Sequence, residues 1–235
     1  MGYQFESRVR YSEVDQKQTM TLNAVINYFQ DCSTFHSEEV GLGIDYLAKA
    51  QGAWVLSFWQ IVLHRLPKFG EKILVQTWPY DFKGFYGSRN FTLLSQDHTQ
   101  LVAANSIWVY VDLKTGHPVR VPKEQMDGYA LEERLDMDYV SRKIAVSEES
   151  VEMPPCSVLK YQLDTNNHVN NGQYVLMASE FLPDDFRVRQ VRAEYKKAAL
   201  LHDVILPKVH LAETSCTVAL CDTKGLPYAI VAFDQ

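Results

Sequence analysis

The sequence lacks any apolar run that could cross a membrane. Nowhere in its 235 residues is there a stretch near the ~20 consecutive apolar residues that a membrane helix needs. Residues 1–6 also lack the basic and apolar regions of a secretory signal peptide, and Glu6 stands where N-myristoylation requires Ser or Thr. These absences predict a cytoplasmic protein without a membrane span.

Cysteine is scarce, and positive charge is in deficit. The chain has four cysteines without CxxC spacing or a histidine at metal-ligand spacing, so we expect free buried thiols, no metal site and no cofactor. The net charge of −6 argues against nucleic acid as a partner, and it means that an acidic partner needs a local basic patch. With 46% hydrophobic residues, the composition is that of a globular protein with a substantial core.

The first half of the chain contains a strand, a long helix and four further strands. Residues 3–14 alternate enough for a strand, and apolar residues then recur at helical spacing from Leu22 to the helix-stopping Gly41. Many positions of this helix are apolar, so we expect a sheet to wrap around it. Strand-like runs follow at residues 53–64, 71–80, 88–96 and 101–112, and Pro79 is expected to end the second of them.

The second half repeats this order in compact form. Residues 114–155, with several prolines and a charged run, indicate a linker with short helical pieces. A strand at 156–163, a polar turn at 164–169, a helix at 170–181 and strands at 187–197, 203–212, 215–222 and 227–233 come next. The class is therefore α+β, with two tandem modules at 1–113 and 156–235, each an antiparallel sheet wrapped around one helix.

The polar turn of the second module carries the residues with the most chemistry. Asp164, Asn166 and His168 stand at alternate positions, so an extended backbone points all three side chains the same way. Behind them, Asn170 or Asn171 can cap the following helix, whose first N–H groups are free to bind an oxyanion. The alternative is an Asx-rich turn that only starts a helix.

The duplication localises this chemistry to one module. Asp15 and Asp164 occupy corresponding places, but the residues after Asp15 include neither histidine nor asparagine before the helix begins. We therefore expect one active site per chain and a first module that is free to hold the ligand. Its aromatic residues suit a pocket for an apolar ligand or, alternatively, ordinary core packing, and they are Trp54, Phe58, Trp59, Trp78, Tyr80, Phe82, Phe85, Tyr86 and Trp108.

The turn resembles the Asp-x-Asn-x-His-x-Asn-Asn signature of acyl-acyl-carrier-protein thioesterases. Residues 54–70, 106–112 and 194–197 are similar to other segments of that family, in the same order along the chain. The resemblance implies tandem hotdog modules and hydrolysis of fatty acyl-acyl carrier protein, which ends fatty-acid elongation. It also implies acyl carrier protein bearing a fatty acyl-phosphopantetheine as the partner, and the trio in the turn as catalytic.

Thioester hydrolysis gives each member of the trio a possible role. His168 can exchange protons near neutral pH, and Asn166 can hold the imidazole tautomer or donate to the oxyanion. Asp164 can orient the imidazole, position water or attack the carbonyl directly. These alternatives stay open at the level of sequence, with Asn170 and Asn171 as supporting residues.

The chain departs from the plant members of the family at two positions. Their strand continues with Glu-Cys where this sequence has Ala198 and Ala199. A mechanism with a cysteine at that place is therefore impossible here, and one candidate base for water is lost. Asp164 inherits that role by elimination, and Glu194 is a weaker supporting candidate because strand alternation gives it the parity of Ala198.

A basic stretch near the end of the chain is a candidate docking surface. Residues 186–208 contain six basic residues against Glu194 and Asp203, a balance of +4 (six minus two) in an otherwise acidic protein. Acyl carrier protein is acidic, so this stretch can attract it, although a solvated strand face is the alternative. The docking candidates are Arg187, Arg189, Arg192, Lys196 and Lys197.

Two other activities remain open. One is an acyl-CoA thioesterase of the same superfamily, and the other is a non-hydrolytic acyl-binding protein, suggested by Ala198 and Ala199. The sequence determines neither the acyl chain length and saturation preference nor the oligomeric state, for which a homodimer is one possibility.

Overall fold

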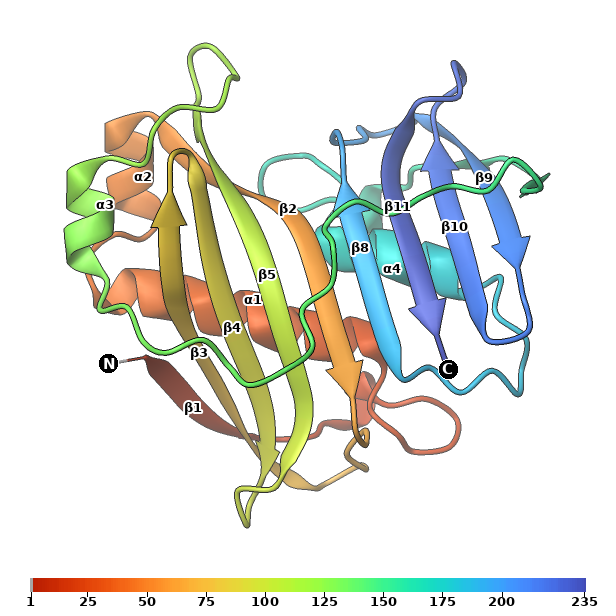
Figure 1. Cartoon of the computed structure of the whole chain (residues 1–235), viewed down its shortest axis with the longest axis horizontal. Helices are drawn as coiled ribbons and strands as arrows, with labels where there is room; N and C mark the ends of the chain where they lie inside the picture. Colours follow the sequence, from red (N-terminus) through yellow and green to blue (C-terminus); the bar gives the residue numbers. More distant parts are fainter. Residues whose placement is uncertain (1) are drawn as a thin grey trace. The chain divides into compact units, whose positions relative to one another are not determined.

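The computed structural model describes residues 2–235, which divide into two compact units. The first unit comprises the chain up to Ser57 and Ile61–Tyr139, and the second comprises Phe58–Gln60 and Val140–Gln235. Each unit is an antiparallel sheet with a helix against one face (Figure 1). This is the α+β architecture that the repeated pattern predicted.

The sheet of the first unit is antiparallel and follows the order β1-β3-β4-β5. These strands are β1 (Tyr3–Arg8), β3 (Lys72–Lys83), β4 (Tyr86–Ser95) and β5 (Gln100–Asp112). A further long strand, β2 (Gly52–Leu63), precedes β3 in the chain. Four of the five strands lie within a few residues of the predicted runs. Strand β1 is shorter than the predicted strand 3–14, because the chain turns after Arg8.

Helix α1 (Leu22–Glu39) crosses one face of this sheet, behind β3, β4 and β5 in Figure 1. Thr21 caps it by accepting the N–H of Ala24 at 3.2 Å. The buried face follows helical spacing, and the Phe29 ring lies 5.1 Å from that of Phe91 on β4. The prediction of a sheet-wrapped helix is therefore confirmed. A second helix, α2 (Ile44–Ala50), was not predicted because none of its residues is buried and it has no apolar stripe.

The expectation that Pro79 ends its strand was wrong. Strand β3 continues through Pro79 to Lys83, and its register with β4 shifts between Pro79 and Asp81. Proline cannot donate a ladder hydrogen bond, and a bulge lets a strand accommodate it.

The second unit repeats the plan with shorter elements. Its antiparallel strands follow the order β8-β11-β10-β9-β6, and β7 also pairs with β9. The strands are β6 (Val151–Glu152), β7 (Cys156–Ser157), β8 (Gln190–Tyr195), β9 (Val204–Leu211), β10 (Ser215–Cys221) and β11 (Pro227–Asp234). Helix α4 (Asn171–Ser179) lies against one face. The predicted strand 156–163 was wrong in extent, because after β7 the chain turns into a 3₁₀ helix, η2 (Lys160–Gln162).

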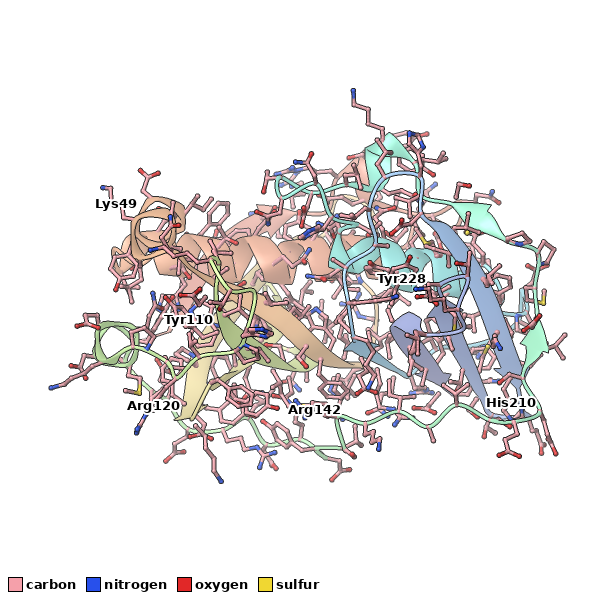
Figure 2. The ribbon with its side chains drawn as sticks, turned by 90° about the horizontal axis from the view of Figure 1, so that it is seen from above. Lys49, Tyr110, Arg120, Arg142, His210 and Tyr228 are labelled. Atoms are coloured by element: carbon pink, nitrogen blue, oxygen red, sulfur yellow. The ribbon has the colours of Figure 1, made fainter. Side chains whose placement is uncertain are left out.

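The segment between the modules covers the other face of each sheet. It contains helix α3 (Lys123–Gly128). In the first unit, Asn90 Oδ1 accepts the Leu135 N–H at 3.1 Å and the Tyr139 hydroxyl at 3.0 Å. In the second unit, Figure 2 shows α4 on one side of the strands and the segment that carries Arg142 on the other. Each sheet is therefore enclosed on both faces.

Two further predictions concerned the cysteines and membrane-spanning helices. All four cysteines are free, but Cys156 is exposed, contrary to the expectation that every thiol is buried. Among residues 2–235, no helix is long and apolar enough to span a membrane.

Candidate functional site

Residues 163–169 form a tight loop, called here the Asp164 turn. The Asp164 N–H donates to the His168 carbonyl at 2.7 Å, and the Asn167 N–H donates to the Asp164 carbonyl at 3.1 Å. A bridge between Leu163 and Val169 closes the base of the loop. Asn167 has a φ of +60°, a left-handed conformation that asparagine tolerates better than most residues.

The Asp164 carboxylate holds this loop from inside. Its Oδ1 accepts the backbone N–H of Asn166 at 2.8 Å and that of His168 at 3.1 Å. Across residues 2–235, no hydrogen bond reaches Asp164 Oδ2, the Asn166 amide or the His168 ring. Asp164 therefore does not orient the imidazole through a side-chain bond, and Oδ1 alone of its two oxygens holds the loop.

Helix α4 begins directly after this loop. Asn170 is the capping residue, because its Oδ1 accepts the Gly172 N–H at 2.9 Å, and Asn171 is the first helical residue. The Asn170 N–H donates to the Gln162 carbonyl at 2.9 Å, which ties the loop to η2. The turn thus lies at the positive end of a helix, where developing negative charge is stabilised.

The Ala199 peptide links the Asp164 turn to helix α4, and the two hydrogen bonds that it forms are called here the clamp. The Tyr174 hydroxyl of α4 accepts the Ala199 N–H at 2.8 Å, and the Ala199 carbonyl accepts the Val169 N–H at 3.0 Å. A further bridge joins His168 and Leu200. Burial raises the pKa of Tyr174 to about 12, so its phenol stays neutral at physiological pH. The segment where this chain departs from the plant enzymes therefore lies beside His168.

The first unit contains a second loop with the same backbone, called here the Asp15 turn (residues 14–20). Asp15 Oδ1 accepts the N–H groups of Lys17 and Thr19, both at 2.9 Å. The Asp15 N–H donates to the Thr19 carbonyl at 2.8 Å, and Gln18 has a φ of +57°. A bridge between Val14 and Met20 closes its base. Each interaction that shapes the Asp164 turn has its counterpart here.

The two turns differ in the side chains they present. Lys17 and Thr19 stand where the Asp164 turn has Asn166 and His168. The Thr19 hydroxyl oxygen accepts a hydrogen bond from Lys68 Nζ at 2.6 Å. Because the shared aspartate folds both loops, its contacts to the backbone are structural, and the amide and imidazole are what distinguish the second loop.

The clamp is also confined to the second unit. In the first unit the Met20 N–H donates to the Pro67 carbonyl at 2.9 Å, the counterpart of the Val169–Ala199 bond. Pro67 has no N–H to satisfy, and Val25 stands at the position of Tyr174, where it offers no hydroxyl. The sequence analysis did not identify this role of Tyr174. The signal was that the second module has Tyr174 and Ala199 where the first has Val25 and Pro67.

The structure does not place Glu194 at the turn, so this prediction was wrong. Glu194 Oε2 accepts the Ile144 N–H at 3.0 Å, and Oε1 pairs with Lys196. Its neighbour Tyr195 points to the opposite face, where its hydroxyl donates to the Asn171 carbonyl at 3.0 Å. Glu194 therefore lies against the connecting segment, on the face of the sheet away from α4.

The parity argument for Glu194 failed because the strand does not alternate regularly beyond Tyr195. The N–H groups of Lys196 and Lys197 both point at the Tyr228 carbonyl, at 2.8 and 3.3 Å. Two residues opposite one are the signature of a bulge, which breaks the alternation before Ala198.

The basic stretch is largely neutralised by carboxylates from elsewhere in the chain. Arg192 Nε lies 3.5 Å from Asp234, and Lys197 pairs with Asp222. The Lys197 ammonium holds the pKa of Asp222 at about 2. The local balance of +4 overstated the surface charge, because it omitted acidic residues that neighbouring strands bring alongside.

Two of the docking candidates keep their charge exposed. Arg187 and Arg189 are both exposed, and neither forms an ion pair with any residue in 2–235. They are the members of the predicted surface whose charge is not neutralised by a carboxylate among the described residues.

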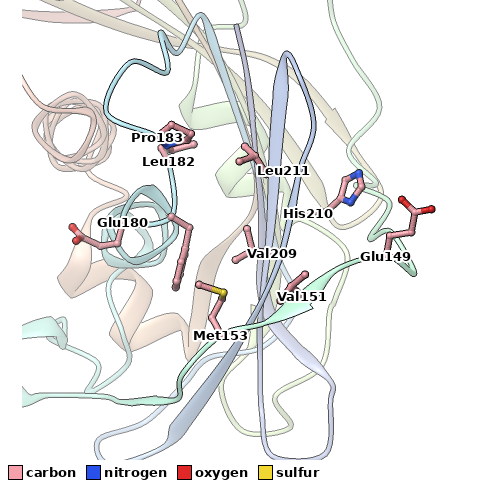
Figure 3. Close-up of a pocket in the computed structure, with 10 residues that line it drawn as sticks. Glu149, Val151, Met153, Glu180, Leu182, Pro183, Val209, His210 and Leu211 are labelled. Carbon is pink, nitrogen blue, oxygen red and sulfur yellow. The ribbon is translucent and has the colours of Figure 1, made fainter.

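A groove in the second unit lies apart from the turn (Figure 3). It has a volume of about 650 Å³ and lies between the end of α4 and strands β6 and β9. Its lining includes Met153, Phe181, Val209 and Leu211 but not Asp164, Asn166 or His168. Within the described chain, no group of three His, Cys, Asp or Glu side chains is arranged to hold a metal ion.

Because the Asp15 turn and the Asp164 turn have equivalent hydrogen bonds, we predict equal losses of local stability for two substitutions. Asp164→Ala and Asp15→Ala each remove an acceptor of two backbone N–H groups, so each should destabilise its loop by about 1–3 kcal/mol. Amide hydrogen exchange at residues 163–169 and 14–20 measures this locally. Asp→Asn at either position keeps the acceptor oxygen and serves as the control. Faster exchange in only one of the two alanine variants would show that the loops are not equivalent.

The clamp predicts a specific effect of Tyr174→Phe. The Ala199 N–H then loses its acceptor in a buried position, which costs about 1–3 kcal/mol and speeds amide exchange at Ala199 and Val169. Tyr195→Phe is the matched control, because it removes another hydroxyl contact to α4 without touching Ala199. Equal exchange at Ala199 in the two variants would contradict the clamp.

Comparison with known proteins identifies the family. The model of the acyl-ACP thioesterase N-terminal domain matches residues 2–129, more than half of the chain. The palmitoyl-acyl carrier protein thioesterase of Gossypium hirsutum is 25% identical over 207 residues, which cover 80% of this chain and 50% of that protein. Oleoyl-acyl carrier protein thioesterase 1 of Arabidopsis thaliana is 25% identical over 227 residues, covering 87% and 62%. The chain thus spans about half the length of the first relative.

Solved structures share the fold over almost the whole chain. An acyl-ACP thioesterase from Bacteroides thetaiotaomicron superposes with a TM-score of 0.90 at 23% identity, covering 98% of this chain and 96% of that one. The 12:0-ACP thioesterase of Umbellularia californica gives a TM-score of 0.88 at 19% identity, with 99% and 96% covered. With the family model matching most of the first unit and the fold shared throughout, this chain belongs to the acyl-ACP thioesterase family.

Proposed function

We propose that this chain hydrolyses the thioester of fatty acyl-acyl carrier protein, releases the free fatty acid and so terminates elongation. Family membership supports the reaction class, and the curated relatives carry names that specify acyl carrier protein thioesterases. The observation that carries the proposal is the difference between the two turns. On one shared backbone, only the Asp164 turn has an asparagine and a histidine two and four residues after its aspartate, where the Asp15 turn has Lys17 and Thr19.

In the proposed reaction, Asp164 acts through the oxygen that the loop does not use. Asp164 Oδ2 takes a proton from water, and the water oxygen forms a bond to the thioester carbonyl carbon. The Asn166 amide donates to the oxyanion that develops, and the positive end of α4 stabilises its charge. The carbon–sulfur bond then breaks, and His168 gives a proton to the thiolate. Transfer of the water proton from Asp164 to His168 through solvent restores both groups.

Elimination supports Asp164 in this role. The family's glutamate and cysteine are absent at Ala198 and Ala199, and Glu194 lies on the other face of the sheet. Asp164 and His168 are then the titratable side chains of the loop itself. Asn170 and Asn171 support them by starting the helix at the end of the loop.

We assign binding of the acyl chain to the first predicted module, residues 1–113, and catalysis to the second, residues 156–235, joined by 114–155. The first unit has the same turn with Lys17 and Thr19 at the positions of Asn166 and His168, and its interior contains buried aromatic side chains such as Phe29 and Phe91. Arg187 and Arg189 are the proposed contacts for the acidic carrier. We place the reaction in the cytoplasm, as the sequence predicts, whereas the matched plant relatives are named chloroplastic.

An acyl-CoA thioesterase is the second candidate, favoured by one observation. Arg192, Lys196 and Lys197 pair with carboxylates of this chain, so the surface for an acidic protein carrier is smaller than the sequence indicates. The two activities separate in matched kcat/KM measurements on one acyl chain attached to acyl carrier protein or to CoA.

The proposed site predicts opposite results for one pair of substitutions. His168→Ala should lower kcat by at least ~10²-fold, the scale for removing a positioned acid–base group. Thr19→Ala, at the same place in the Asp15 turn, should leave kcat unchanged. The assay is hydrolysis of acyl-acyl carrier proteins and acyl-CoAs from C8 to C18, with folding checked by circular dichroism. Full activity of folded His168→Ala would rule out this site, and equal or better turnover of CoA substrates would favour the second candidate.

A further inference from the structure

The first unit contains a buried arginine on the face of the sheet that α1 covers. Arg89 of β4 is 8% exposed. Its Nη1 donates to His36 Nδ1 of α1 at 2.9 Å and to the Thr77 hydroxyl of β3 at 3.2 Å. The guanidinium also lies over the Tyr129 ring, with Cζ 5.3 Å from the ring centroid.

All of these partners are neutral. A guanidinium can only donate, so His36 accepts through an unprotonated Nδ1. Burial and the nearby Arg89 charge lower the pKa of His36 to about 4, which keeps its ring uncharged at neutral pH. In residues 2–235, Arg89 forms no ion pair with an aspartate or glutamate. A buried cation without a counter-ion is costly, and such groups occur where a ligand completes them.

The side of the Arg89 guanidinium formed by Nε and Nη2 can bind a carboxylate. Both hydrogen bonds of Arg89 start from Nη1, so the N–H groups on Nε and Nη2 have no acceptor among the described residues. Nε and Nη2 form the edge that binds two oxygens of one carboxylate in parallel. A single charge in an enclosed place matches a monoanion better than a phosphate dianion.

A second buried donor lies along the same row of aromatic rings. Gln125 of α3 is fully buried, and its Oε1 accepts the Trp54 indole N–H at 3.0 Å. Its Nε2 has no hydrogen-bond partner in the chain from residue 2 onward. The Trp54 ring lies 5.9 Å from Phe82, which lies 6.1 Å from Tyr129, the ring beneath Arg89. An aromatic row with one buried donor that lacks an acceptor, beside a guanidinium edge that has no protein acceptor, suits an aliphatic ligand that carries oxygen.

We propose that the interior of the first unit binds the carboxylate of an aliphatic ligand at Arg89, with Nε and Nη2 as the anchoring pair. Two sources supply this chemistry. One is a free fatty acid, and the other is an acyl chain that ends in a second carboxylate. Only the second source rests on the proposed thioesterase activity, because binding of a free acid requires no hydrolysis.

The test compares decanoate with 1-decanol, which has the same chain length and no charge. By isothermal titration calorimetry, decanoate should bind the full-length protein at least ~10-fold tighter than decanol, the scale of charge-assisted hydrogen bonds. Arg89→Gln should abolish that preference. Arg120→Gln, which removes an exposed arginine of the same unit, should preserve it. Equal affinities in the unaltered protein, or a preference that survives Arg89→Gln, would overturn the proposal.

A measurement without substitution covers the case in which Arg89→Gln does not fold. Arginine Nε–Hε signals in the ¹⁵N NMR spectrum of the unaltered protein report a carboxylate that binds at Nε. Decanoate should shift one buried arginine signal, and decanol should leave it in place. The proposal fails if decanoate moves no such signal at saturation.

Hydrolysis kinetics distinguish the two possible ligands, the free fatty acid and the acyl chain that ends in a second carboxylate. If decanoyl chains with a terminal carboxylate are released from acyl carrier protein with higher kcat/KM than plain decanoyl chains, and Arg89→Gln removes the difference, the distal carboxylate is the ligand. If instead free decanoate competes with substrate and the plain chain is preferred, the fatty acid is the ligand. A protein that hydrolyses neither substrate contradicts the proposed function, while the decanoate titration still decides the Arg89 site.

Discussion

The structure depends on one interaction that occurs twice, an aspartate carboxylate that accepts two N–H groups of its own loop. Asp15 and Asp164 each close a short turn in this way, between a 3₁₀ segment and the start of the unit's helix. The contact determines where the next helix begins and which side chains point outward. An acceptor bound to two donors rigidifies a segment that would otherwise be a mobile polar loop, and a rigid backbone is what a catalytic group needs.

Duplication separates the structural part of the site from its chemistry. The Asp15 turn keeps the backbone but presents Lys17 and Thr19, and Pro67 removes the N–H that Tyr174 satisfies in the other unit. The second unit adds an amide, an imidazole and a clamp to the same frame. The first unit instead buries a cation and a row of aromatic rings, features that suit a ligand rather than a reaction. One fold thus provides two environments through a few side-chain differences.

The sequence was sufficient for most of the strands, for helices α1 and α4 and for the position of the polar turn before α4, because these follow from periodicity and capping residues. The alternation of Asp164, Asn166 and His168 assumed an extended backbone, and this was wrong, because the segment is a closed turn with Asn167 at a φ of +60°. It failed where distant residues decide the outcome. Helix α2 buries nothing and so has no periodic signal. Glu194 was misplaced because a bulge at Lys196 and Lys197 cannot be recognised without the partner strand. The basic stretch was overestimated because its ion-pair partners Asp222 and Asp234 lie later in the chain, outside the stretch. The role of Tyr174 was missed because its bond to Ala199 joins residues that are neighbours only in space.

The central claim is that Asp164 has two functions, one per oxygen: Oδ1 folds the loop and Oδ2 performs the chemistry. Asp164→Asn separates them, since the amide oxygen still accepts both backbone N–H groups whereas the carboxylate is gone. The decisive measurement is kcat for acyl-acyl carrier protein in Asp164→Asn and Asp15→Asn, with amide exchange of both loops recorded alongside. The account predicts intact loops in both variants and a loss of at least ~10²-fold in kcat for Asp164→Asn alone. Undiminished kcat in Asp164→Asn would show that this aspartate, like Asp15, only folds its loop.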